Sequence, residues 1–454
     1  MSDMNEEMQI LFDNYTALMD GGQYLQLKQE LNEEQPANIA EYFEELTAEK
    51  QLFIFRLLSK DVAAEVFSYM DNDTQEHIVQ SITDREVRNI VDEMFLDDTV
   101  DFLEEMPANV VKKVLQNADE GTRKTINQFL NYPENSAGSL MTIEYVDLHD
   151  YFTVRKAMDY IRRTGIDKET VYTCYVIDDQ RKLVGQVSLR KLIIAPESAC
   201  IRDIMDTNIV SAVTTDDQEA VADDFRRYDL TSIAVCDKEN RLVGIITIDD
   251  IVDVIQDENT EDIKKMAAII PSDEDYMKTS VWSLVAHRLP WLMLLMISAT
   301  FTSTIITHFE TLLSGAVLLT AFIPMLMDSA GNSGSQTSVT VIRNLALGEI
   351  EMKDWPRVLV KEIGVAVVAG AALAVVNFLR IIIFTSTSTM IAAVVSITLF
   401  CTVIIAMIVG CLLPIGAKRL GFDPAVMASP MITTIVDACS LMIYFLIAST
   451  MLGL

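Results

Sequence analysis

A single carboxylate, Asp437, stands in the apolar segment Met431–Tyr444 near the end of the chain. An ionised carboxylate at bilayer depth costs at least about 2.5 kcal/mol, so a residue of this kind is expected to serve a function. The segment has no lysine or arginine that could neutralise Asp437. In a two-fold dimer, two copies of Asp437 would face each other and supply two negative charges, which match one divalent cation.

A second feature is the polar stretch from Phe322 to Gln336, FIPMLMDSAGNSGSQ, between the apolar halves of one expected span. Non-helical backbone at membrane depth is tolerated only where it is buried in protein or lines water. We expect Gly331 and Gly334 to let the chain bend and approach its neighbours, and Asn332, Gln336 and exposed carbonyl groups to hold the water shell of an ion. The alternative is a helix kink that is satisfied by packing within the protein.

The available donor atoms indicate which cation fits. The six cysteines contain no CxxC pair and the four histidines are scattered, so neither residue type forms a zinc-like cluster. Carboxylate, amide and carbonyl oxygens suit magnesium, calcium or manganese. Magnesium sheds water reluctantly and is commonly held through its waters by one or two carboxylates, whereas calcium takes about six to eight ligands. A symmetric aspartate pair therefore favours magnesium.

The excess negative charge lies entirely in residues 1–280. These residues contain 58 Asp and Glu against 27 Lys and Arg, and the difference of 31 equals the formal net charge of the whole chain, −31. The later part is balanced and contains apolar runs close to the roughly 20 residues that cross a bilayer. We expect an acidic cytosolic head before a membrane body, with cations rather than nucleic acid as partners. The acidic start, MSDMNEE, is unlike a secretory signal.

The first part of the head repeats with a period of 24 residues when it is cut at Gln23, Thr47, Asp71 and Phe95. Apolar residues recur at fixed positions of these units: Leu31, Phe55, Val79 and Leu103 at one position, and Tyr42, Val66, Ile90 and Val114 at another. Such recurrence predicts short helical hairpins stacked as a small solenoid. The simplest function would be protein docking, with its acids forming a solvated face.

A second repeat follows the breaker Asn131-Tyr-Pro133. The segment from Lys182 to Ile193 matches the segment from Arg241 to Val252 at a spacing of 59 residues, which indicates duplicated βαββα units. The arrangement resembles a tandem pair of CBS domains, in which a Thr and an Asp can hold an adenosine ribose. Thr247 and Asp250 match this pair, whereas the first copy has Ser188 but Lys191 in place of the acid. A nucleotide site, such as one for ATP, would be at most half complete.

An acid-dense connector links the head to the membrane part. Asp249, Asp253 and Asp257 fall at i, i+4 and i+8, so a helix here would carry a column of like charges that destabilises it by a few tenths of a kcal/mol per pair. A cation would relieve this repulsion, and a solvated acidic helix is the alternative. A second helix, Tyr276–Leu289, is expected to lead to the bilayer.

Five membrane spans fit the apolar runs, at about 290–307, 313–346, 356–384, 388–416 and 424–452. Basic residues cluster before the first span and in every second loop after it, which predicts a cytoplasmic head and an external C-terminus. Asp423-Pro424 reads as the N-cap and first turn of the last span. One bundle of five helices makes a poor pathway, whereas a homodimer could line one along its axis.

In the order of these features the chain resembles the bacterial MgtE family of magnesium channels and transporters. The resemblance depends most on two motifs, Pro324…Gly331-Asn332…Gly334…Gln336 and Asp423-Pro424-Ala425…Pro430…Asp437. It implies a multi-domain membrane protein with an α-helical solenoid N domain, α/β tandem CBS domains and an all-α bundle of five transmembrane helices. The expected boundaries are 1–132 for the N domain, 133–256 for the CBS pair (about 136–198 and 199–256), 257–286 for a connecting plug helix and 287–454 for the membrane domain.

The resemblance also implies a function and its residues. It predicts a homodimer in the bacterial cell membrane that takes up magnesium through a selective pore with Asp437 at its centre. The other pore residues would be Asp328, Gly331, Asn332 and Gly334. Cytosolic magnesium would close the pore by binding regulatory acids, which are Glu65, Asp97, Asp101, Asp217, Glu219, Asp229, Asp250, Asp253, Glu258, Glu261, Asp262 and Asp423.

Other functions remain open at this point. A membrane-anchored sensor of ions or nucleotide would need no conduction, although it would also have no use for Asp437 at bilayer depth. Transport of other divalent cations, such as Co²⁺, is a further alternative. An enzyme is not expected, because neither a nucleophile–base pair nor a phosphate-cradling loop is visible in the sequence. The chain also has Ser429 where some family members have Asn, and an acid at Asp328 where others have none.

Overall fold

The computed structural model describes residues 2–272, 276–277, 279–309, 317–385, 387–427 and 429–453. The chain forms two compact units, Met1–Ile255 and Gln256–Leu454. Helix α16 (Ile248–Met266) begins in the first unit and ends in the second. The first four residues of the expected span 313–346 lie outside the described residues.

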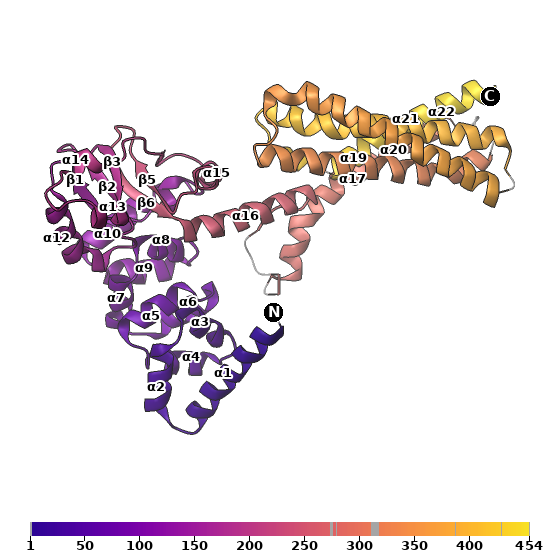
Figure 1. The fold of residues 1–454 in the computed structure, drawn as a ribbon. Coiled ribbons are helices and arrows are strands. Elements are labelled where there is room, and N and C mark those ends of the chain that lie inside the picture. The colour runs from indigo at the N-terminus through magenta and orange to yellow at the C-terminus, as the bar shows by residue number, and fades with distance from the viewer. Residues whose placement is uncertain are drawn as a thin grey trace. The chain divides into compact units, whose positions relative to one another are not determined.

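The first unit opens with a series of short helices (Figure 1). Their bounds are α1 (Ser2–Asp20), α2 (Tyr24–Glu33), α3 (Pro36–Glu44), α4 (Ala48–Phe55), α5 (Lys60–Ser68), α6 (Asn72–Ser81), α7 (Asp84–Glu93), α8 (Leu96–Glu104), α9 (Ala108–Asn117) and α10 (Glu120–Phe129). The even-numbered helices from α2 to α10 begin at residues 24, 48, 72, 96 and 120, so the 24-residue repeat is confirmed. The recurring apolar residues, such as Leu31 and Val66, are fully buried between these helices.

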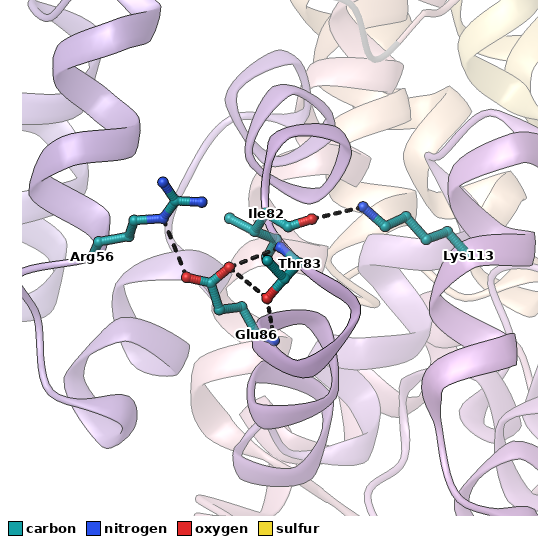
Figure 2. A network of polar contacts seen from close by, with 5 residues as sticks. All are labelled: Arg56, Ile82, Thr83, Glu86 and Lys113. Atoms are coloured by element: carbon teal, nitrogen blue, oxygen red, sulfur yellow. Dashed lines mark hydrogen bonds and ion pairs between the residues drawn. The ribbon is translucent and has the colours of Figure 1, made fainter.

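Polar contacts join neighbouring repeats (Figure 2). Thr83 and Glu86 form a capping box at the start of α7, in which each side chain accepts a hydrogen bond from the other residue's backbone N–H. Arg56 donates to Glu86 at 3.2 Å, and Lys113 of α9 donates to the carbonyl oxygen of Ile82 at 2.9 Å. These contacts fix the loop between α6 and α7 against both adjacent hairpins.

Two small sheets follow, one from each half of the duplicated segment. The first consists of β1 (Asp147–His149), β2 (Thr173–Ile177) and β3 (Leu183–Ser188), and the second of β4 (Ser211–Val213), β5 (Ser232–Cys236) and β6 (Leu242–Thr247). In both sheets the first two strands are parallel and the last two antiparallel. The registers also agree, because Gly185 pairs with Val176 and Gly244 pairs with Val235. The predicted duplication is confirmed.

The helices of these two halves are α11 (Ala137–Leu140), α12 (Val154–Thr164), α13 (Leu189–Ile194), α14 (Ile201–Ile204) and α15 (Gln218–Tyr228). Helix α16 then starts directly after β6. As a result, the acids at the beginning of α16 are held at the end of a buried strand, and β6 fixes their position.

The second unit is built from long helices. They are α17 (Val281–His308), α19 (Ile323–Ala346), α20 (Trp355–Phe384), α21 (Thr389–Arg419) and α22 (Ser429–Leu452), with the 3-10 turns η2 (Val317–Phe322), η3 (Met352–Asp354) and η4 (Pro424–Met427). Among the described residues, four segments are long and apolar enough to cross a membrane: 281–308, 352–384, 389–419 and 430–452. Helix α21 packs against α19, α20 and α22, with Val395, Val403 and Tyr444 in the buried core.

Three expectations about this unit are wrong. The polar stretch does not break its span, because α19 is a continuous helix from Ile323 to Ala346 and the backbone changes only at its junction with η2. The last long helix starts at Ser429 rather than at Pro424, which instead opens the separate turn η4. The helix expected at Tyr276–Leu289 is the first part of α17, which starts at Val281 and continues through Pro290.

Candidate ion-binding sites

The glycines of α19 lie where this helix crosses α21 and α22. A side chain at Gly334 would come within 2.9 Å of Ile432 and 3.1 Å of the carbonyl oxygen of Ala406. A side chain at Gly410 of α21 would overlap the carbonyl group of Gly334. Gly331 meets Thr433 of α22 in the same way, at 3.1 Å. These glycines therefore permit close helix packing, and their predicted role as ion ligands stays a prediction.

The polar residues of α19 lie on a different side of the helix. Asp328, Asn332 and Gln336 are spaced at i, i+4 and i+8 and are all exposed in the single chain, whereas Gly331 and Gly334 are buried. Asp437 on α22 is half-buried and lies close enough to Asp328 for the two carboxylates to repel each other. The structure thus brings two carboxylates together beside an amide-bearing helix face.

In the first unit a group of carboxylates forms between α8 and the start of α16. Asp97 and Asp98 of α8 lie near Asp250 of α16 and near Glu169, in the loop before β2. Asp101 and Asp249 stand at the exposed edge of this group. Asp98 is one of the acids expected from the sequence to form a solvated face of the helical repeats, and Glu169 is not among the acids expected to bind magnesium. No sequence signal could have found Glu169, because only the folded chain places it beside α8.

We call these carboxylates the acid group. Their negative charges lie close together, and this proximity is electrostatically unfavourable. Burial and the nearby charge of Asp249 raise the pKa of Asp98 and of Asp250 to about 6. Burial and the charges of Asp249 and Asp250 raise the pKa of Glu169 to about 7, and burial together with Asp250 raises the pKa of Asp97 well above its usual range. Shifts of this kind mean that the folded chain favours removal of negative charge from this place.

A bound cation would offset the negative charge of the acid group. Over the described residues, no three His, Cys, Asp or Glu side chains are close enough together to hold a metal ion directly. A cation bound to this arrangement would be held partly through its own waters, as magnesium commonly is. The donor set of carboxylate oxygens without thiolate or imidazole fits a hard cation.

Several other predicted regulatory acids have local structural roles. Asp217 caps the start of α15 by accepting a hydrogen bond from the backbone N–H of Glu219 at 2.9 Å. Asp229 ends the same helix in a left-handed conformation, with φ of 50°. Glu65 on α5 and Asp253 on α16 are exposed. Their roles as magnesium ligands stay predictions.

The end of α16 meets the membrane part through an ion pair network. Lys265 Nζ lies 2.7 Å from Glu261 Oε1 and 2.7 Å from Asp423 Oδ2. Burial and the charge of Asp423 raise the pKa of Asp262, which directly follows Glu261 on α16. Asp423 also accepts a hydrogen bond from the N–H of Ala425 at 2.8 Å, so it caps η4 and not α22. Glu258 is half-buried on the preceding turn.

The predicted nucleotide residues lie inside the acid group. The hydroxyl of Thr247 donates a hydrogen bond to Asp249 and contacts Asp250 at 3.1 Å. The expected role of Thr247 and Asp250, holding an adenosine ribose, stays a prediction. A cavity of about 510 Å³ in the first copy has the basic residues Arg190 and Lys191 in its lining, together with Ser188 and one acid, Asp203. The basic pair that follows β3 is the sequence signal that could have identified it.

The chain is similar to known proteins over almost its whole length. A family model described as the MgtE intracellular N domain matches residues 34–135, a CBS domain model matches 137–198 and 201–257, and a divalent cation transporter model of the MgtE type matches 323–447. The magnesium transporter MgtE of Thermus thermophilus is 35% identical, with 94% of this chain and 95% of that protein covered. The magnesium transporter MgtE of Bacillus subtilis is 32% identical, with 95% of each chain covered.

Two solved structures resemble the head. The cytosolic domain of the Mg²⁺ channel MgtE in complex with ATP is 34% identical, with a TM-score of 0.50, and the match covers 53% of this chain and 99% of that one. The soluble part of a magnesium transporter is 28% identical, with a TM-score of 0.53, and covers 55% and 99%.

Proposed function

Because the chain belongs to the MgtE family of magnesium transporters, we propose that it forms a magnesium-selective pathway across the membrane that closes when cytosolic magnesium binds its acidic head. The family is one of transporters rather than enzymes, and it has an intracellular N domain. The proposal depends most on one observation: Asp437 of α22 lies close to Asp328, on the polar face of α19.

The pathway needs a second copy of the chain. Asp328, Asn332 and Gln336 form a polar column that is exposed in a single chain, which is costly at membrane depth unless it faces water or protein. A two-fold axis beside this column would place two copies of Asp437 and Asp328 around one passage. In this proposal α19 is the fifth membrane-crossing helix of each chain, and its polar face explains its lower hydropathy. The C-terminus then lies outside the cell.

The same proposal keeps the domain boundaries expected from the sequence, 1–132, 133–256, 257–286 and 287–454. Family models that match 34–135, 137–198 with 201–257, and 323–447 support this division. The acid group of Asp97, Asp98, Glu169 and Asp250 is the proposed sensor. Its raised pKa values support cation binding, because removal of negative charge there stabilises the head.

Flux measurements in proteoliposomes test the pathway. Replacement of Asp437 by Ala should abolish magnesium uptake while the protein still folds and associates, because both axial carboxylates are lost. Replacement of Asp423 by Ala is the matched control, since Asp423 caps η4 from the residue before it and should alter regulation but keep conduction. Wild-type flux with D437A would remove Asp437 from the pathway. A folded wild-type protein without any flux would favour the alternative, a membrane-anchored sensor. Competition by Co²⁺ in the same assay tests the selectivity.

Nucleotide binding is a second candidate function. A relative's cytosolic domain binds ATP, and the first-copy cavity of this chain has the cations Arg190 and Lys191 to receive phosphates. Lys191 is also paired with Asp206 at 3.6 Å, so phosphate binding would have to compete with that carboxylate. Calorimetric titration of the head with ATP should give binding that is weakened by K191A and unaffected by D250N. The opposite pattern would return the site to Thr247 and Asp250.

A further inference from the structure

At the end of α16, Lys265 lies between two carboxylates. Its ammonium group lies 2.7 Å from Glu261 and 2.7 Å from Asp423, which belong to α16 and to the turn before η4. Its side chain is only 24% exposed and that of Asp423 is 34% exposed. This ion pair is therefore partly shielded from water, unlike most surface pairs.

The surroundings of Lys265 contain more negative than positive charge. Asp262 lies close enough for the charge of Asp423 to act on it, so its negative charge adds to those of Glu261 and Asp423, the two carboxylates paired with Lys265. Lys265 is also in the last turn of α16, where the helix dipole favours a cation. Without Lys265, Glu261, Asp262 and Asp423 would repel each other.

Other contacts show that this ion pair is part of a docking surface. Met266 packs against the buried side chains of Ile342 on α19 and Ala425 on η4. Arg343 of α19 donates a hydrogen bond to Asn259 of α16 at 3.0 Å. The end of α16 is thus attached to the segment immediately before α22, the helix that carries Asp437, and to the end of α19.

We propose that Lys265 is a tethered cation that holds the end of α16 on the membrane unit in the absence of magnesium, so that magnesium can bind Glu261 and Asp423 only by displacing it. The ammonium is a compact charge with three donors, which suits two carboxylates from different segments. It is always at high local concentration because it is part of the chain, whereas magnesium must arrive from solution. The inference concerns regulation and rests on the proposed magnesium gating.

Cross-linking measures this docking without any transport. Cysteines introduced at Met266 and Ala425 in the full-length protein should react with a short thiol cross-linker when the end of α16 is docked, and the protein without this pair gives the background from its native cysteines. At low magnesium, K265M should slow the reaction about tenfold, because charge-assisted hydrogen bonds are lost and the carboxylates repel. Millimolar magnesium should restore the rate, since the freed carboxylates can then share the ion.

Three further variants separate this mechanism from a general disturbance. K265R keeps the positive charge and should react at close to the wild-type rate. K264M changes the neighbouring lysine, which contacts the carbonyl of Ser272 instead, and should also behave like the wild type. D423N should slow cross-linking at low magnesium, and magnesium should rescue it less well than K265M because one ligand is gone.

Each result has a defined meaning. Equal cross-linking of K265M and wild type at low magnesium would overturn the proposal. Slow cross-linking that magnesium fails to restore would overturn its second half, the competition between Lys265 and the ion. A wild-type protein that shows the expected cross-linking but conducts no magnesium would instead contradict the proposed function and leave the role of Lys265 in docking established.

Discussion

Neutralising Asp98 should stabilise the magnesium-free head. The carboxyl group of Asp98 is half-buried, and burial together with the charge of Asp249 raises its pKa from 3.8 to about 6. A shift of roughly two units corresponds to about 3 kcal/mol of unfavourable free energy when the group is ionised. Because water still reaches part of the side chain and screens its charge, we expect about 1–2 kcal/mol from D98N.

The sign of the pH dependence follows from the raised pKa. The folded state disfavours the ionised form, so the cost is fully present above about pH 6 and disappears as the pH falls below about 4, where the unfolded chain is also protonated. D98N should therefore raise the melting temperature of the magnesium-free head at neutral pH by about 2–8 °C. The gain should vanish near pH 4.

Thermal unfolding of the head can check these values, since the soluble part of a similar magnesium transporter has been crystallised separately. Magnesium should raise the melting temperature of the wild type more than that of D98N, because the ion stabilises the acid group that the mutation has already relieved. E41Q, at an exposed acid of α3, is the control and should change little. A head that D98N destabilises at neutral pH, or stabilises equally at pH 4, would refute the reasoning.

Two further predictions concern packing and capping. G410A should prevent correct assembly of the membrane unit, because the new methyl group would overlap the carbonyl of Gly334. G416A is the control and should be tolerated, because open space surrounds Gly416. Size-exclusion profiles in detergent distinguish the two variants. E86Q should destabilise the head by about 1 kcal/mol at neutral pH, since it weakens the capping box. Burial alone would raise the pKa of Glu86, but hydrogen bonds from Thr83 and the charge of Arg56 outweigh it and lower the pKa below 4.5. The stabilisation by Glu86 is therefore present above about pH 4.5 and lost as the pH falls further. The melting temperatures of E86Q and wild type should converge in acid. A difference that persists there would contradict this role of Glu86.

Features with a sequence period were predictable, whereas contacts between distant segments were not. The positions of the short helices follow from a 24-residue repeat of buried apolar residues, and the two sheets follow from the match between the segments that contain Gly185 and Gly244. For Gly331 and Gly334 the expected close approach to neighbouring helices is confirmed and the expected bend is wrong, because a glycine that allows a bend and one that allows a close crossing look alike in sequence. The difference depends on partners such as Gly410 and Thr433, which only the folded chain brings near.

The two ends of α16 differ in a way that bears on how magnesium could act. Asp250 at its start lies among carboxylates whose raised pKa values indicate a lack of compensation, whereas Asp423 near its end already has Lys265 as a partner. A divalent ion gains more free energy where negative charge is uncompensated than where it must first displace an ammonium group. Low concentrations of magnesium should therefore act first at the start of α16. Binding there does not require a magnesium ion at Asp423, where Lys265 already compensates the negative charge.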